Sequence, residues 1–131
     1  MRRDFRLPEQ DEQFLGGLGL AWETISEPSN RWLLLQAYPI PRGYNHLQVD
    51  VIVNVSPGYP DAQLDMVYFH PHLARLDGKG LIQVAGGHSV NGRDWQRWSR
   101  HRTPANPWRP GVDDLATHLG LVDEWLVREF K

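Results

Sequence analysis

The chain has 131 residues, of which 40% are hydrophobic and 23% are charged, and its formal net charge is −2. One folded globular domain is expected at this length and composition, so a disordered chain is excluded. The slight negative charge excludes a general affinity for nucleic acid, and no apolar run approaches the roughly 20 residues of a membrane span. The absence of cysteine excludes disulfides, zinc–thiolate sites and a cysteine nucleophile. We expect a cytoplasmic protein without a cofactor and without nucleic acid or membrane partners.

The N-terminal part predicts a flexible segment followed by a short helix. Residues 1–7 are expected to be flexible, and the helix is expected over residues 8–15. Pro8 suits the first turn of a helix, where its missing N–H costs nothing. Phe14 and Leu15 would form the apolar side, and the glycines that follow would end the helix.

Four strands are expected in the next part of the chain. They cover residues 21–25, 31–38, 47–55 and 64–69. The third is the clearest, because every second residue is apolar. A Glu-Pro-Ser-Asn turn joins the first two strands, and two prolines break the chain after the third. Consecutive strands of this kind predict an antiparallel meander.

Residues 71–110 show no sustained periodicity and are rich in proline and glycine. Asn91-Gly92 adds a further turn signal within this stretch. A loop of this length in a small domain is expected to be functional rather than a spacer. We therefore expect a long active-site loop here.

The C-terminal part predicts an amphipathic helix. From Val112 to Leu126 the apolar residues recur at steps of three and four, and Asp113 or Asp114 would be the N-cap. The order of helix, four-stranded meander, long loop and helix defines a single α+β domain over residues 1–131. The C-terminal helix is expected to cover one face of the sheet.

Three short motifs, in this order and setting, resemble the ubiquitin-conjugating enzyme superfamily, and most closely its small bacterial members. They are Pro57-Gly58-Tyr59-Pro60, His70-Pro71-His72 and Trp108-Arg109-Pro110. The segments 38–45 and 95–101 add to the resemblance, which spans residues 8–130. It implies a UBC-like fold.

The resemblance also implies an activity. Such a protein accepts the C-terminus of a ubiquitin-like protein from a ThiF-type adenylating enzyme and passes it onward. Two departures from the family pattern are visible. The nucleophilic cysteine is missing, and His72 stands where the motif has an asparagine that supports the oxyanion.

The position of the missing nucleophile is estimated from the motifs on either side. Counting back about eight residues from Trp108 leads to Arg100, next to Ser99, whereas counting forward about ten from His70 reaches no nucleophile. Ser99 is therefore the candidate acyl acceptor. Serine depends on a base, so His101 is the candidate base or orienting group.

Serine in this role would carry an oxyester, which reacts more slowly with amines than a thioester does. A second interpretation is that a cysteine has been replaced in this chain. The positions to consider are Ser99, Ser89 and Ala85.

Further residues are candidates for supporting roles. Those for oxyanion support or for an alternative base are His70, His72 and His88. Those that would shape a groove for the incoming tail are Tyr59, Trp98 and Trp108.

The run from Trp95 to His101 leaves other interpretations open. Its two tryptophans are more typical of core packing than of a ligand platform. A noncatalytic module that binds a ubiquitin-like protein would use the same fold. The histidines also leave open a small metal-dependent hydrolase, although the chain has no HExxH motif.

Overall fold

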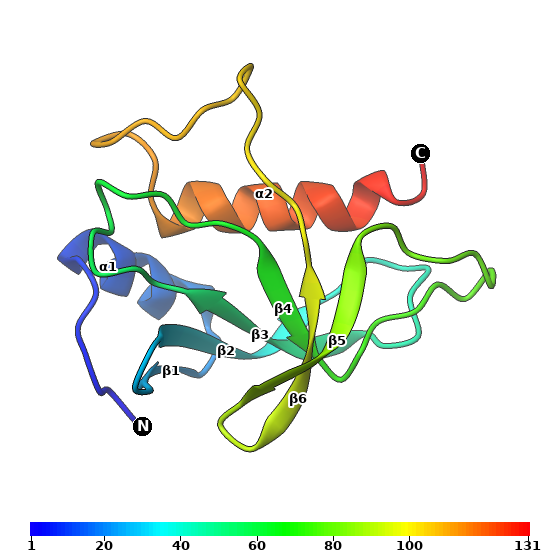
Figure 1. The fold of residues 1–131 in the computed structure, drawn as a ribbon, viewed down its shortest axis with the longest axis horizontal. Helices are drawn as coiled ribbons and strands as arrows, with labels where there is room; N and C mark the ends of the chain where they lie inside the picture. The colour runs from blue at the N-terminus through cyan, green and yellow to red at the C-terminus, as the bar shows by residue number, and fades with distance from the viewer.

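The computed structural model of the protein describes all 131 residues, which form two helices and one antiparallel sheet (Figure 1). The elements are α1 (Glu9–Leu18), β1 (Trp22–Ser26), β2 (Arg31–Pro39), β3 (Gln48–Asn54), β4 (Val67–His70), β5 (Val84–Val90), β6 (Arg93–Trp98) and α2 (Leu115–Arg128). The predicted α+β class is confirmed. The predicted number of four strands is wrong, because the sheet has six in the order β1-β2-β3-β4-β6-β5.

The two additional strands form a hairpin inside the stretch expected to be loop. Its turn is Asn91-Gly92, with φ angles of 51° and 76°, the left-handed pair typical of a two-residue hairpin. Strand β5 contains two glycines and a bulge between Ala85 and His88. Strand β6 is buried on both faces at Trp95, Gln96 and Trp98. Neither strand therefore shows the alternation that identifies a half-buried strand.

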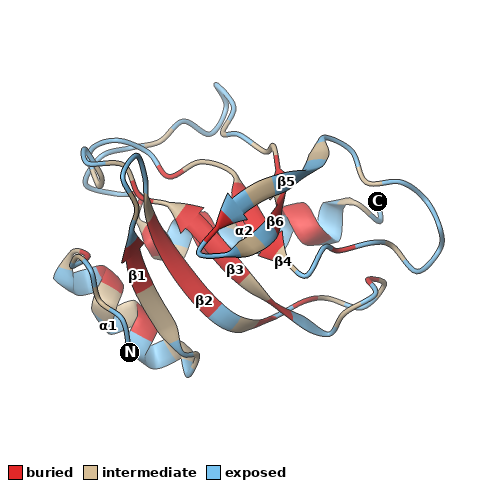
Figure 2. Ribbon diagram, turned by 60° about the horizontal axis from the view of Figure 1, so that its bottom comes forward, coloured by how far each residue is buried: buried red, intermediate tan, exposed pale blue.

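Helix α2 covers the inner face of the sheet, where the main core lies (Figure 2). Leu33, Val51 and Phe69 of the sheet and Leu119 and Val122 of the helix are buried in this core. Asp114 caps α2 through a reciprocal capping box with Thr117, so one of the two predicted N-caps is confirmed. Neither helix has the length and apolar character needed to cross a membrane.

The outer face of the sheet holds a second, smaller core beneath the β5–β6 hairpin. Trp32 and Tyr68 of the sheet pack with Trp95 and Val90 of the hairpin. The hairpin tip reaches the β1–β2 turn, where the Asn91 N–H donates to the Glu27 carboxylate at 3.2 Å. The hairpin therefore arches over this face of the sheet.

The N-terminal segment pairs with the outer edge of β1. Arg3 forms a parallel bridge with Thr24, and the Asp4 N–H donates to the Thr24 carbonyl at 3.0 Å. Helix α1 begins one residue later than expected and ends three residues later, at Leu18. Gly19, with φ of 74°, ends it in the left-handed conformation that glycine favours.

Candidate functional site

Most of the aromatic run that begins at Trp95 belongs to strand β6 and is structural. The Trp95 indole is 1% exposed and donates to the Val90 carbonyl at 3.0 Å. Trp98 is fully buried on the opposite face and donates to the Gln96 side chain at 3.0 Å. Gln96 in turn bonds both the N–H and the carbonyl of Leu73. The core-packing interpretation of the tryptophans is therefore correct.

Ser99 lies directly after β6, in a segment held from both sides. Its N–H donates to the Gln83 carbonyl at 3.0 Å, and the next carbonyl, that of Arg100, accepts from the Met66 N–H at 3.2 Å. Gln83 and Met66 both have positive φ angles, of 54° and 58°. Residues with side chains rarely adopt this conformation, which costs about 1–3 kcal/mol and persists where the surroundings hold it in place. The backbone around Ser99 is thus held by two residues whose own conformations cost free energy.

The Ser99 hydroxyl makes no hydrogen bond within the chain. Ser99 lies on the wall of a shallow pocket of about 220 Å³, together with Trp125 of α2 and Glu129 directly after that helix. Arg100 stacks on the Trp98 ring at 4.9 Å and lies 3.6 Å from the Glu129 carboxylate. Burial lowers the pKa of Arg100, although Glu129 opposes this effect.

His101 points elsewhere, towards the segment that precedes β4. Its Nδ1 lies 2.9 Å from the Asp65 carboxylate, and no hydrogen bond joins it to Ser99. The structure therefore does not bring together the predicted acceptor and its predicted base. The imidazole Nε2 makes no hydrogen bond within the chain.

His70, His72 and His88 lie towards the other end of the hairpin. The His70 Nδ1 bonds the Asp94 carbonyl at 2.8 Å, and the His72 Nε2 lies 2.9 Å from the Asp94 carboxylate. His88 packs edge-on against Tyr68. Because β6 rises by about 3.3 Å per residue, roughly 16 Å separates the backbones of Asp94 and Ser99. These histidines are not placed around Ser99.

Two of the three predicted groove residues meet. The rings of Tyr59 and Trp108 lie 6.1 Å apart, and the Trp108 indole donates to the Pro60 carbonyl at 3.0 Å. The Tyr59 hydroxyl bonds the buried Asp11 carboxylate at 2.5 Å, which connects this loop to α1. Trp98 is buried in the core and does not join them.

Asp113 and Arg102, which none of the three motifs contains, organise the loop before α2. Asp113 is 5% exposed; its carboxylate accepts from the Arg109 N–H at 2.8 Å and from the Arg102 guanidinium at 3.3 Å. Burial raises the pKa of Asp113, but the Arg109 N–H and the nearby guanidiniums outweigh burial, so the pKa lies below its ordinary value. Arg102 also stacks on Trp108 at 5.0 Å. The sequence indicated Asp113 only as a possible N-cap, and it gave no signal for Arg102.

No group of three or more histidine, cysteine or acidic side chains is arranged to hold a metal ion. His70, His72 and His101 each bond an oxygen of an aspartate instead. The interpretation as a metal-dependent hydrolase therefore lacks the ligand cluster that it needs.

The class of protein to which the chain belongs, the E2-like proteins, is shown by its sequence. Comparison with protein-family models gives a match to Prokaryotic E2 family E over residues 7–129. The chain therefore belongs to Prokaryotic E2 family E. Comparisons with curated proteins and with solved structures found no match.

Proposed function

We propose that this protein binds a ubiquitin-like protein in the cytoplasm and positions its C-terminal tail for conjugation, without forming a covalent intermediate itself. Family membership supports the partner class. The observation that carries the noncovalent role is the lack of an activated nucleophile. The chain has no cysteine, and no serine or threonine hydroxyl bonds a histidine ring. Serine is a weak nucleophile without such a base.

In this role the protein works beside a ThiF-type adenylating enzyme, which activates the tail. The Tyr59–Trp108 pair is the best placed aromatic surface to hold an extended tail. It lies half-buried next to the loop that Asp113 organises. Aromatic rings of this kind provide apolar contact area without a charge requirement.

A second candidate function is acyl transfer through Ser99. The free hydroxyl and the costly, fixed backbone around it favour this candidate. In that reaction the Ser99 oxygen attacks the activated carbonyl carbon, the activating group leaves, and the hydroxyl proton passes to a base. For His101 to receive that proton, its ring would have to come within hydrogen-bond reach of Ser99. An oxyester then links Ser99 to the tail.

One experiment separates the two candidates. The purified protein is mixed with the adenylating enzyme, ATP and the ubiquitin-like protein, and analysed by gel filtration and by denaturing electrophoresis. We expect a complex in gel filtration and no adduct under denaturing conditions. An alkali-labile adduct that disappears in Ser99→Ala would establish acyl transfer and contradict the noncovalent proposal.

A cysteine introduced at Ser99 tests whether this position is where the tail arrives. We expect Ser99→Cys to form an adduct that thiols cleave, because a thiol is a far better nucleophile than an unassisted hydroxyl. Ser29→Cys is the matched control, since Ser29 is exposed in the turn between β1 and β2 and lies outside the Ser99 pocket. Equal adduct formation by both variants would show that the tail is not directed to Ser99.

A further inference from the structure

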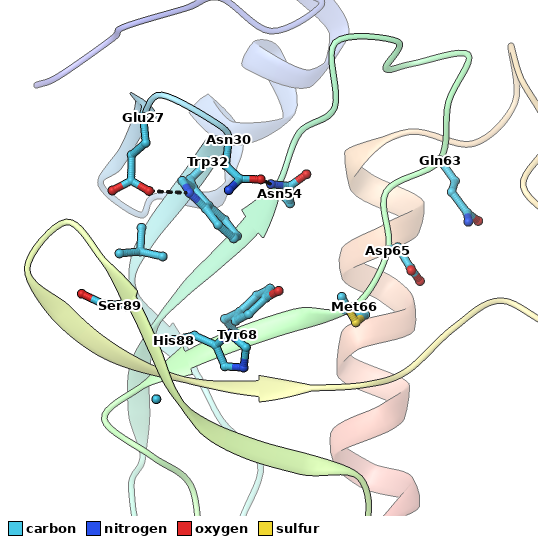
Figure 3. A pocket seen from close by; sticks show the side chains of 12 residues that line it. Glu27, Asn30, Trp32, Asn54, Gln63, Asp65, Met66, Tyr68, His88 and Ser89 are labelled. Carbon is cyan, nitrogen blue, oxygen red and sulfur yellow. Dashed lines mark hydrogen bonds between the residues drawn. The ribbon is translucent and has the colours of Figure 1, made fainter.

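A cavity of about 490 Å³ opens on the outer face of the sheet, where the β5–β6 hairpin arches over it (Figure 3). Its volume lies in the range of small-molecule sites. The residues that line it are Glu27, Asn30, Trp32, Asn54, Gln63, Asp65, Met66, Tyr68, Gly87, His88, Ser89 and Val90. Ser99 is not among them, and α2 covers the opposite face.

The charged groups on the cavity wall are carboxylates. Glu27 and Asp65 line it, and no lysine or arginine does. The two carboxylates lie at opposite ends of the lining in Figure 3. Arg97 pairs with Tyr68 across β4 and β6 but does not line the cavity. A phosphate or carboxylate ligand would find no cation here, whereas a positive group would find a carboxylate at either end.

The aromatic residues of the cavity also favour a cation. Trp32 and Tyr68 pack edge to face with ring centroids 5.2 Å apart, and His88 packs on Tyr68 at 5.6 Å. Aromatic rings attract ammonium groups held within about 6 Å of the ring centre. The side-chain oxygens of Tyr68, Gln63 and Ser89 make no hydrogen bond within the chain. They are therefore available to accept from an ammonium group.

We propose that this cavity binds an alkylammonium group, either the end of a lysine side chain or a free diamine. The site does not depend on the proposed function, because none of Tyr59, Trp108 and Ser99 lines the cavity. Charge, aromatic walls and unused acceptors all point to the same ligand chemistry. The apolar Met66 and Val90 provide contact for the methylene chain that carries the ammonium.

The proposal is tested with the full chain by NMR titration, in which backbone and indole signals of the lining residues report binding. The probes are N-acetyl-lysine amide, its Nζ-acetylated form and putrescine. We expect Nζ-acetylation to weaken binding about tenfold, because it removes the charge that both carboxylates and the rings attract. Tighter binding of the lysine compound assigns a protein side chain as the source, and tighter binding of putrescine assigns a free amine. Equal binding of the charged and acetylated probes, or signal changes outside the cavity, would overturn the proposal.

Conservative variants show which carboxylates act. Asp65→Asn keeps an acceptor for His101, and Glu27→Gln keeps one oxygen for Trp32 or Asn91; each removes a charge and is expected to weaken binding about threefold. Glu124→Gln is the matched control, because this exposed glutamate lies on α2. Ser89→Lys places a competing ammonium at the wall without removing a native hydrogen bond, so it should also weaken binding. Unchanged affinity in all three cavity variants would contradict the site.

Discussion

His118 is a buried histidine whose protonation state is linked to stability. It is 1% exposed, and its Nε2 donates to the Met66 carbonyl at 2.9 Å. Burial lowers the pKa of His118 from its ordinary 6.5 to about 4, against the opposing effect of that hydrogen bond. The imidazole is thus neutral in the folded protein at pH 5, while the unfolded chain is protonated. Stability should be complete above pH 6.5 and fall as the pH drops towards 4, by about 3 kcal/mol from this residue.

The substitution His118→Gln tests this linkage. Glutamine keeps an N–H that can reach Met66 but does not titrate, so the variant should lose much less stability between pH 7 and pH 4. Denaturant unfolding across this range measures the difference. His46→Gln, a change at a histidine outside the core, is the matched control. A His118→Gln variant with the full wild-type slope would show that another group is responsible.

The β5–β6 hairpin depends on its two-residue turn. Gly92 has a φ of 76°, a conformation that costs a residue with a Cβ about 1 kcal/mol, although no atom lies within 4 Å of an added Cβ. Gly92→Ala should therefore destabilise the protein by about that amount through backbone strain alone. Gly120→Ala is the matched control, because Gly120 lies exposed within α2 and also has open space around it. There the same change should stabilise by up to about 1 kcal/mol. Thermal and denaturant unfolding measure the change in stability of both variants. If the two substitutions changed stability in the same direction, the proposed role of the turn would be contradicted.

The same hairpin shows which elements the sequence makes predictable. In strand β3 the buried Val49, Val51 and Val53 recur with the period of a strand, and in helix α2 the buried residues recur with the period of a helix. The hairpin has no such pattern, since β6 is buried on both sides and glycines interrupt β5. Its Asn91-Gly92 turn was the one local signal for it. An Asn-Gly pair predicts a hairpin only when strands are predicted on both sides of it, and here a loop was expected on both sides.

The candidate site was less predictable than the fold, because contacts between distant segments decide it. Ser99 and His101 are two residues apart, yet one faces the C-terminal half of α2 and the other turns to Asp65. Asp65 lies 36 residues before His101 in the chain, and no local pattern links them. Asp113 likewise was predicted only as a possible cap, whereas it holds the loop before α2.

At the scale of the whole molecule, the sheet has two edges and each is protected differently. At β5 the bulge interrupts the edge, and Gly87 donates its N–H to the Asp94 carboxylate. At β1 the N-terminal segment covers the edge: the Thr24 N–H donates to the Arg2 carbonyl, and the Thr24 carbonyl accepts from Asp4. Unpaired strand edges promote association between chains, so both devices favour a protein that stays separate from its copies.

Removal of residues 1–4 tests the protection of the β1 edge. The deletion exposes the unpaired backbone of Thr24 but leaves the core residue Leu7 in place. We expect the shortened chain to self-associate increasingly with concentration, as measured by light scattering after gel filtration, because its edge can then pair with another strand. A chain that lacks only Lys131 is the control, since that residue covers no strand. If the shortened chain associates no more than this control, the edge of β1 does not need the N-terminal segment, and charge or strand length must protect it instead.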